Sequence, residues 1–447
     1  MSLSNPGVAA EHFESLSRWL RSTRLAGEEF TLCYSAEASD FVRFNRARVR
    51  QAGHAQQASA TLELFRAERH ASYTVTLCGE REEDRRRLAD ARQQLRDLLE
   101  HLPADPYLLF NAEDWRSESS SIALPPDAEE VIAQITAGAD GSDLVGIYAN
   151  GPLFRGFSNS CGAFGWHAAS SCNFDWSLFD ASGRAVKSML AGPTWNAEAF
   201  LQRMDSARLQ LQHLSRPARQ LSPGAYRTYL APAALEELLA YVSYDGFSAR
   251  GIHTKKSVLQ QLASGQAALS PLIDLDERIS GSPSPAFTNE GAQRENIKLI
   301  ERGRLVGQLT GFRSAREYGL RSNGSTSSET PEALLMGAGT LPSIEVLETL
   351  GSGLYIGNLW YVNQSDVAAA RLTGLTRFAT FWVENGEIQA PVASMRFDDS
   401  LYDFLGEHLL ALTKERELIV SASTYGERRT ASMRLPGALT NRFTLTL

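Results

Sequence analysis

The sequence has few cysteines and no long apolar run. Four cysteines in 447 residues are too sparse for the disulfide framework of a small secreted protein. The first residues, MSLSNPGVAAEHF, contain neither the basic nor the apolar segment of a secretory signal peptide. No run of about 18 apolar residues occurs, so we expect no membrane-spanning segment. These absences predict a cytoplasmic protein with no membrane partner.

Positive charge is also in short supply. Lys and Arg total 44 against 52 Asp and Glu, which gives a formal net charge of -8. A nucleic-acid-binding protein needs a basic surface that displaces counterions from phosphate groups. The basic run Arg85–Arg87 directly follows the acidic run Glu82–Asp84, a mixture typical of the solvated face of a helix. We therefore expect no nucleic-acid partner.

The common catalytic and metal-binding motifs are missing as well. No two of the eight histidines are four residues apart, so there is no H-E-x-x-H motif, and neither G-x-S-x-G nor a Walker A loop occurs. The one tight mixed group, Cys161, His167 and Cys172, lacks a fourth ligand. Strand alternation would also point Cys172 away from the other two, so core packing is the preferred interpretation. The residues alone thus indicate no catalytic and no metal-binding site.

What is present is a composition with 43% hydrophobic and 21% charged residues, which suffices for a sizeable core. Apolar periodicity predicts helices over residues 11–24, 82–101, 125–135, 195–214 and 235–242. Alternating or Thr- and Val-rich segments predict strands over residues 30–34, 40–50, 58–65, 71–77, 143–157 and 162–179. Residues 103–125 have the composition of a linker. The segment SRPARQLSPG predicts a boundary between domains 1–215 and 216–447. This order favours an α+β fold.

Two segments carry a resemblance to a known family. One is FTNEGAQR at residues 287–294, and the other is FWVENGEIQAPV at residues 381–392. Both resemble the TldD/PmbA family of peptidases, also labelled modulators of DNA gyrase, and the second segment is the more specific match. Its Asn385-Gly386 pair favours a type I′ hairpin turn. The resemblance implies an N-terminal α/β domain with a mainly antiparallel sheet, followed by a β-rich C-terminal domain.

The helix after residue 231 divides the members of this family. In TldD-like members it carries a His-Glu…His motif, and a late cysteine completes a zinc site. Here Ala233–Phe247 contains no histidine, and residues 417–447 contain no cysteine. The resemblance therefore implies a non-catalytic, metal-free member of the TldE/PmbA type. Such a member pairs with a TldD-like protease subunit that holds the zinc, and together they degrade or mature unfolded peptides.

Motif matching also implies positions that contact the substrate or line its channel. These positions are Asn289, Glu290, Gly291, Glu384, Asn385 and Gly386. Roles in turns and sheet packing are an equally good interpretation of each. The segment Ala370–Arg377 replaces the usual TGDYS of the family, so the resemblance implies no substrate contact at this segment.

Two alternatives stay open. The first is an independent metal-dependent peptidase that uses Glu236 or Glu237 with Asp245 and His253, since carboxylate-rich sites favour harder metals than zinc. The second is a regulatory binding protein without a proteolytic role. The acidic charge balance argues against DNA contact but allows contact with another protein.

Overall fold

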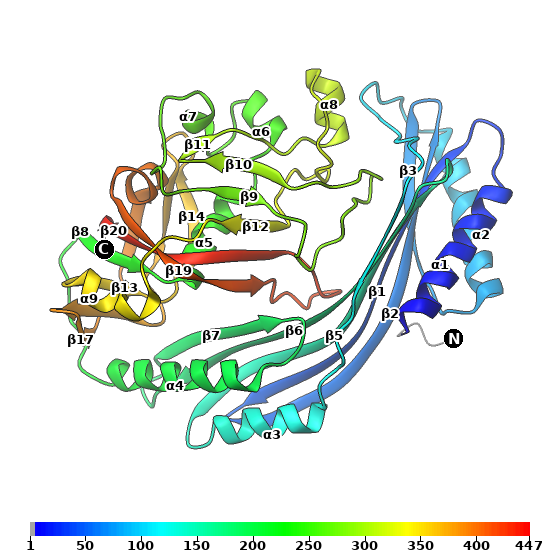
Figure 1. Cartoon of the computed structure of the whole chain (residues 1–447). Helices are drawn as coiled ribbons and strands as arrows, with labels where there is room; N and C mark the ends of the chain where they lie inside the picture. Colours follow the sequence, from blue (N-terminus) through cyan, green and yellow to red (C-terminus); the bar gives the residue numbers. More distant parts are fainter. Residues whose placement is uncertain (1–4) are drawn as a thin grey trace.

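The computed structural model describes residues 5–447. In this range the first sheet has seven strands in the order β3-β2-β1-β5-β6-β4, with β7 paired to β6. Every pair is antiparallel except β4 with β6. The sheet forms a long curved layer (Figure 1). Its strands are β1 (Glu29–Asn45), β2 (Arg48–Arg66), β3 (Arg69–Thr76), β4 (Arg116–Ser121), β5 (Asp143–Asn159), β6 (Phe164–Phe179) and β7 (Ala185–Gly192).

Helices cover the convex face of this sheet, two at each end (Figure 1). They are α1 (Pro6–Ser22), α2 (Arg81–Leu99), α3 (Ala128–Gly138) and α4 (Ala197–Leu214). The first helix begins after Asn5, whose side chain accepts hydrogen bonds from two free backbone amides of the first turn. Phe13, Leu16 and Leu20 are completely buried, because residues three and four apart share one face of a helix.

The second sheet has thirteen strands within the described range, and its main path is β11-β10-β9-β12-β20-β8-β13-β16-β17. Most pairs are antiparallel, but β12 with β20 and β13 with β8 are parallel. Its strands are β8 (Gly224–Leu230), β9 (Leu275–Glu277), β10 (Ile297–Glu301), β11 (Arg304–Leu305), β12 (Ala333–Met336), β13 (Gly353–Ile356), β14 (Trp360–Asp366), β15 (Arg371–Leu375), β16 (Thr380–Glu384), β17 (Glu387–Pro391), β18 (Arg396–Ser400), β19 (Leu409–Val420) and β20 (Ser432–Leu445).

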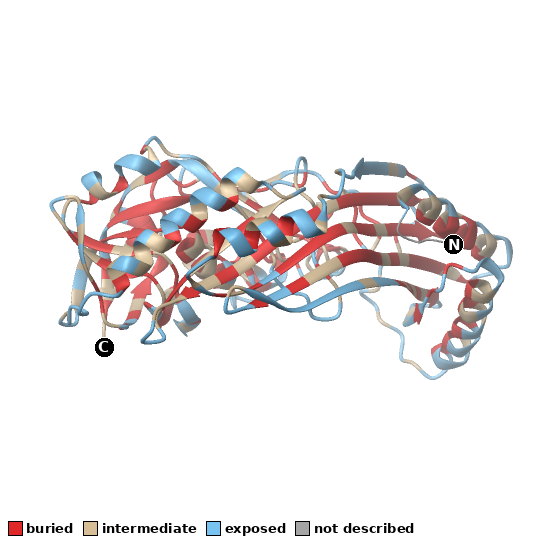
Figure 2. Cartoon of the chain, turned by 90° about the horizontal axis from the view of Figure 1, so that it is seen from below, coloured by how far each residue is buried: buried red, intermediate tan, exposed pale blue. Residues whose placement is uncertain are grey.

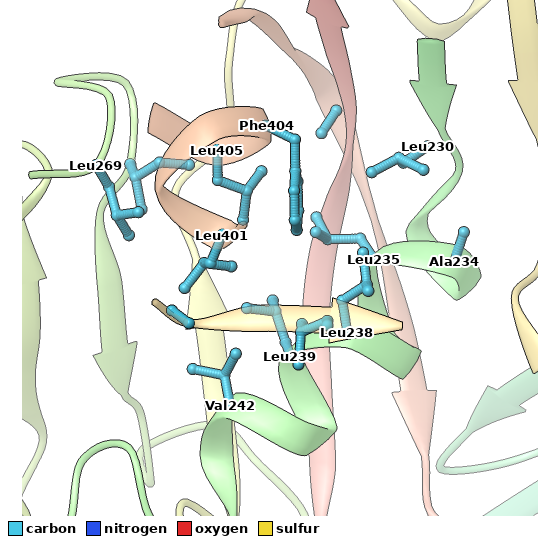
Figure 3. Close-up of a cluster of buried hydrophobic side chains, with 14 of the residues drawn as sticks. Leu230, Ala234, Leu235, Leu238, Leu239, Val242, Leu269, Leu401, Phe404 and Leu405 are labelled. Atoms are coloured by element: carbon cyan, nitrogen blue, oxygen red, sulfur yellow. The ribbon is translucent and has the colours of Figure 1, made fainter. Parts of the chain in front are cut away.

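The helix α5 (Pro232–Ser243) lies in the core of this second part. Figure 3 shows its leucines pointing toward Leu401, Phe404 and Leu405. The shorter helical segments are α6 (Ala249–His253), α7 (Gln260–Ala263), α8 (Phe312–Tyr318), η1 (Ser343–Glu345), α9 (Val346–Leu350) and η2 (Asp403–Glu407). The residues of α5 that do not face this core are therefore the ones available to a ligand.

The two sheets pack against each other on the concave side of the first (Figure 1). Phe381 of β16 belongs to the same buried cluster as residues of α4, and Arg203 of α4 forms an ion pair of 2.9 Å with Glu417 of β19. Buried residues run along the long strands, whereas the outward faces of the helices are exposed (Figure 2). The mixed α+β architecture predicted from the sequence is confirmed. The predicted boundary between residues 215 and 216 lies between the two sheets and stays a prediction.

The strand predictions for the first sheet need two corrections. Residues 30–34 and 40–50 are not two strands, because β1 is continuous and turns into β2 at Arg46 and Ala47. Both turn residues have positive φ, at 52° and 54°, and no Asn-Gly pair marks the turn. Residues 103–125 are also more than a linker, since β4 pairs within them with β6. Among the described helices, none combines the length and apolar character that crossing a bilayer requires.

Candidate functional site

A cavity of about 810 Å³ lies on the concave face of the first sheet. Its floor is made by β1, β2 and β3, which present Ser35, Ser59, Thr61 and Thr74. Successive strand residues point to opposite faces, so the polar residues of these strands gather on this side. The opposite wall comes from three loops, over residues 285–290, 326–332 and 427–431. Hydroxyl groups at this spacing can hydrogen-bond to an extended chain without selecting its sequence.

Glu290 stands at the edge between this cavity and a neighbouring one of about 290 Å³. Its Oε1 accepts a hydrogen bond of 3.1 Å from the backbone amide of Ser327. Its Oε2 is enclosed and has no hydrogen-bond partner in the part of the chain that the structure describes. An enclosed carboxylate oxygen without a donor is costly, so this oxygen is suited to accept an N–H group from a bound molecule.

The turn that positions Glu290 is fixed by Gly291. The carbonyl of Gly291 accepts hydrogen bonds from Asn111 Nδ2 at 2.7 Å and from the indole N–H of Trp115 at 3.0 Å. Gly291 has φ of +83°, and a Cβ at this position would lie 2.5 Å from the ring of Phe157. The close approach and the left-handed backbone both require glycine here.

We expect Gly291→Ala to lower the free energy of unfolding by about 3 kcal/mol, from the left-handed backbone and the clash with Phe157. Gly281→Ala is the matched control, because Gly281 has φ of +79° and open space around its Cβ position. The control should lose only about 1 kcal/mol. Urea unfolding of both variants measures the difference, and equal losses would contradict a packing role for Gly291.

Asn289 is exposed and lies next to Cys33 of β1. The Cys33 thiol donates to the carbonyl of Asn289 across 3.3 Å. Burial is the main cause that raises the pKa of Cys33, and the nearby charges of Glu290 and Glu63 raise it further. A thiol held protonated is a poor nucleophile. Cys33 lines the floor of the cavity, and its raised pKa disfavours the thiolate form.

The second predicted group lies in a hairpin turn and not in this cavity. Asn385 and Gly386 have φ of 51° and 79° and join β16 to β17, which confirms the predicted turn. Glu384 accepts hydrogen bonds from the indole of Trp382 at 2.8 Å and from Arg219 at 2.9 Å. These two bonds, that from Trp382 first, lower the pKa of Glu384. In the structure, Glu384 thus hydrogen-bonds to other side chains of the same protein. A role of Glu384, Asn385 and Gly386 in substrate contact stays a prediction.

The carboxylates of α5 line a smaller cavity of about 170 Å³ with Lys187 and Arg203. Burial raises the pKa of Glu236 to about 7, with a further rise from Glu237 and Asp175 and a decrease from Lys187. Glu236 and Glu237 are half-buried, because α4 and β19 cover this side of α5.

Stability should depend on pH through Glu236. A carboxyl group whose pKa is raised by folding binds protons better in the folded state, so stability falls as the pH rises from about 4.5 to about 7. We expect Glu236→Gln to remove about 2 kcal/mol of this loss, after allowance for solvent screening. Urea unfolding at pH 5 and pH 8 measures it, with exposed Glu198→Gln as the control. A pH-independent effect of Glu236→Gln would contradict the assignment.

The ligand set of the metal-dependent alternative is not assembled. His253 stacks on Tyr318 with ring centres 4.7 Å apart, and its Nδ1 lies 3.2 Å from the Ala249 carbonyl. Over residues 5–447, no three His, Cys, Asp or Glu side chains are grouped so as to hold a metal ion. The grouping of Glu236 or Glu237 with Asp245 and His253 is therefore wrong.

Of the three residues first considered as a mixed metal group, two are buried and one is exposed. Cys172 is enclosed in the core. The ring nitrogens of His167 lie 2.7 Å from Ser119 Oγ and 2.9 Å from the Pro283 carbonyl, while Cys161 is exposed in a turn. The packing interpretation holds for His167 and Cys172.

Residues 223–446, half of the chain, match the family described as PmbA/TldA metallopeptidase C-terminal domain. The chain belongs to the PmbA/TldD family. Metalloprotease PmbA of Escherichia coli O157:H7 is 29% identical over 194 residues, which are 42% of this chain and 42% of that protein. A metalloprotease PmbA homolog of Haemophilus influenzae is 25% identical over 228 residues, or 51% of this chain and 48% of its own length. The chain thus covers about half or less of the length of each of these two PmbA proteins.

Solved structures of PmbA/TldD-like proteins share the fold over almost the entire chain. TldE from Thermococcus kodakarensis superposes with a TM-score of 0.75 at 15% identity, covering 98% of this chain and 100% of that one. A protein described as a modulator of a DNA gyrase from Thermotoga maritima gives 0.74 at 15% identity, covering 98% and 99%. A similar protein from Bacteroides thetaiotaomicron gives 0.75 at 16%, covering 97% and 98%. At these identities the likeness concerns the fold.

Sequence reasoning found one part of the cavity and missed the rest. The Glu-Gly segment placed Asn289 and Glu290, and both line the cavity. The sequence analysis did not identify the hydroxyl residues of β2 and β3, nor Ser327 and Arg429, as part of the cavity. The alternation in Ser59-Ala60-Thr61 was a usable signal for a polar strand face. Nothing in the sequence around Ser327 or Arg429 distinguishes those residues from ordinary loop residues.

Proposed function

We propose that this PmbA/TldD-family chain is a non-catalytic subunit that binds an unfolded peptide and pairs with a zinc-bearing, TldD-like protease subunit. The observation that carries this proposal is the absence of histidine ligands from α5. The positions of α5 that line its cavity are Pro232, Ala233, Glu236 and Glu237, and the helix contains no histidine. In TldD-like members, by the resemblance of sequence, this helix supplies zinc ligands.

The concave cavity supports the peptide part of the proposal. Its hydroxyl-lined floor and the free Oε2 of Glu290 suit a ligand that offers many main-chain N–H and C=O groups. An extended peptide offers such groups whatever its side chains are. A folded protein keeps its main-chain groups paired internally, so the cavity favours unfolded chains.

The test compares the chain alone with the chain co-purified with a TldD-like protein from the same genome. We expect the lone chain to be metal-free and inactive on peptides, and the complex to hold about one zinc ion per pair and to cleave them. Stoichiometric metal and cleavage by the lone chain would overturn the proposal. A TldD-like protein that cleaves peptides equally well with and without this chain would favour the regulatory alternative.

A further inference from the structure

A second cavity on the concave face, of about 270 Å³, is not used by the proposal above. Arg43, Asn173, Asp175 and Lys187 reach it from β1, β6 and β7. The other side is closed by the loop between β19 and β20 and by two aromatic side chains. This loop extends to the long sheet in Figure 1, and Arg428 anchors it there by hydrogen bonds to backbone carbonyls.

The cavity contains cations without partners. Arg43 and Arg429 are both exposed, and among the described residues no carboxylate lies within 4 Å of either guanidinium. Lys187 Nζ is 3.9 Å from a carboxylate oxygen of Asp175, which is the one acidic side chain among the described residues that line this cavity. Two free guanidinium groups beside a single carboxylate give a positive site. Guanidinium groups bind carboxylates through charge-assisted hydrogen bonds.

The same cavity also contains an acceptor without a donor. Asn173 is only 6% exposed, and its Nδ2 donates weakly to the carbonyls of Val420 and Ser421 at 3.4 and 3.5 Å. Within residues 5–447, its Oδ1 has no hydrogen-bond partner, and neither has Oδ1 of Asp175. Buried polar atoms are nearly always hydrogen-bonded. A ligand that fits must therefore offer an N–H group close to its carboxylate.

An aromatic wall completes the site. Trp360 and Phe378 both line the cavity, with ring centres 5.7 Å apart in an edge-on arrangement. Phe378 has φ of +73° and Tyr361 has φ of +56°. Left-handed backbone is costly for such bulky residues, and such strain gathers at binding sites. Phe378 directly follows Ala370–Arg377, the segment that departs from the usual family pattern.

We propose that this cavity binds the C-terminal residue of a peptide. Arg43 and Arg429 bind the terminal carboxylate, Oδ1 of Asn173 accepts the last peptide N–H, and an apolar terminal side chain packs on Trp360 and Phe378. This inference rests on the proposed peptide-binding function. It adds that the chain recognises the C-terminal end of the peptide. Arg429 also lines the 810 Å³ cavity, so the remainder of the peptide would continue there.

The test uses the purified full chain and a fluorescein-labelled hexapeptide that ends in phenylalanine. Fluorescence anisotropy compares the free acid with the C-terminal amide. We expect the amide to bind at least about tenfold more weakly. Arg43→Gln and Arg429→Gln should each weaken the acid and leave the amide unchanged, and Trp360→Ala should weaken both. Arg48→Gln, at an exposed position of β2, is the control and should change neither.

Equal affinities for acid and amide in the wild type would overturn the proposal, and so would a lone chain that binds neither peptide. Arginine variants that keep the preference for the acid would also overturn it. A lone chain that binds neither peptide would also contradict the peptide-binding part of the proposed function, whereas equal binding of acid and amide would leave that part intact. The metal and cleavage measurements decide the pairing with a protease subunit separately. Circular dichroism of each variant confirms that a loss of binding is not a loss of folding.

Discussion

Arg294→Met is expected to lower the free energy of unfolding by about 3–5 kcal/mol, the usual effect of removing one partner from a buried ion pair. Arg294 forms 2.5 Å contacts with both Glu277 and Glu332. Glu277 is 1% exposed, and burial raises its pKa although Arg294 and two backbone amides act in the other direction. Without Arg294, that carboxylate would be left in the core with no cation. Urea unfolding monitored by circular dichroism measures the loss.

Two further variants make this expectation specific to the ion pair. Arg304→Met removes an arginine from an exposed position of β11, and it should change stability by less than about 0.5 kcal/mol. Adding Glu277→Gln to Arg294→Met removes the buried charge and should restore part of the stability. A double variant less stable than Arg294→Met would show that the lost stability came from packing and not from an unpaired charge.

Arg428→Met is expected to cost about 3 kcal/mol, because it removes donors from several buried acceptors at once. The guanidinium of Arg428 donates to Ser39 Oγ at 3.2 Å and to the carbonyl of Ser171 at 2.6 Å. The carbonyls of Ala149 and Gly151 accept from it at 3.4 Å. Burial lowers the pKa of Arg428, and Glu37 partly counters this. The loop over residues 421–431 should therefore detach from the sheet when Arg428 is lost.

Limited trypsin digestion followed by mass spectrometry reads out this detachment. In Arg428→Met we expect cleavage after Arg429 to become several times faster than in the wild type, because proteases cut where the backbone opens. Arg434→Met, at an exposed position of β20, should leave both the cleavage rate and the stability as they are. Unchanged cleavage after Arg429 in the Arg428 variant would mean that other contacts hold the loop.

The sequence predicted those elements whose signals are local. Asn385-Gly386 predicts its own turn, since both residues tolerate positive φ, and the helices follow their apolar spacing. The turns at Arg46-Ala47 and Ala67-Glu68 also have positive φ, but their residue types give no indication of it. Pairing of the long strands imposes these turns. The continuity of β1 therefore could not be predicted from short segments of sequence.

The candidate site could be predicted only where a motif marks it. Glu290 meets Ser327 across 37 residues, and Cys33 meets Asn289 across 256. Contacts over such distances are set by how the two sheets pack, which no local pattern records. The raised pKa of Glu236 has the same origin, because its main cause is burial by the side chains that cover α5.

The unbroken course of β1 has a consequence for the size of a bound molecule. Ser35 faces the larger concave cavity and Arg43 the smaller one. Eight strand residues cover about 26 Å, at roughly 3.3 Å each. An extended peptide rises by nearly the same distance per residue, so a peptide lying along β1 would need about eight residues to contact both Ser35 and Arg43. A shorter fragment along β1 would reach Ser35 or Arg43 but not both, so the length of this single strand would determine how long a peptide must be to use both positions.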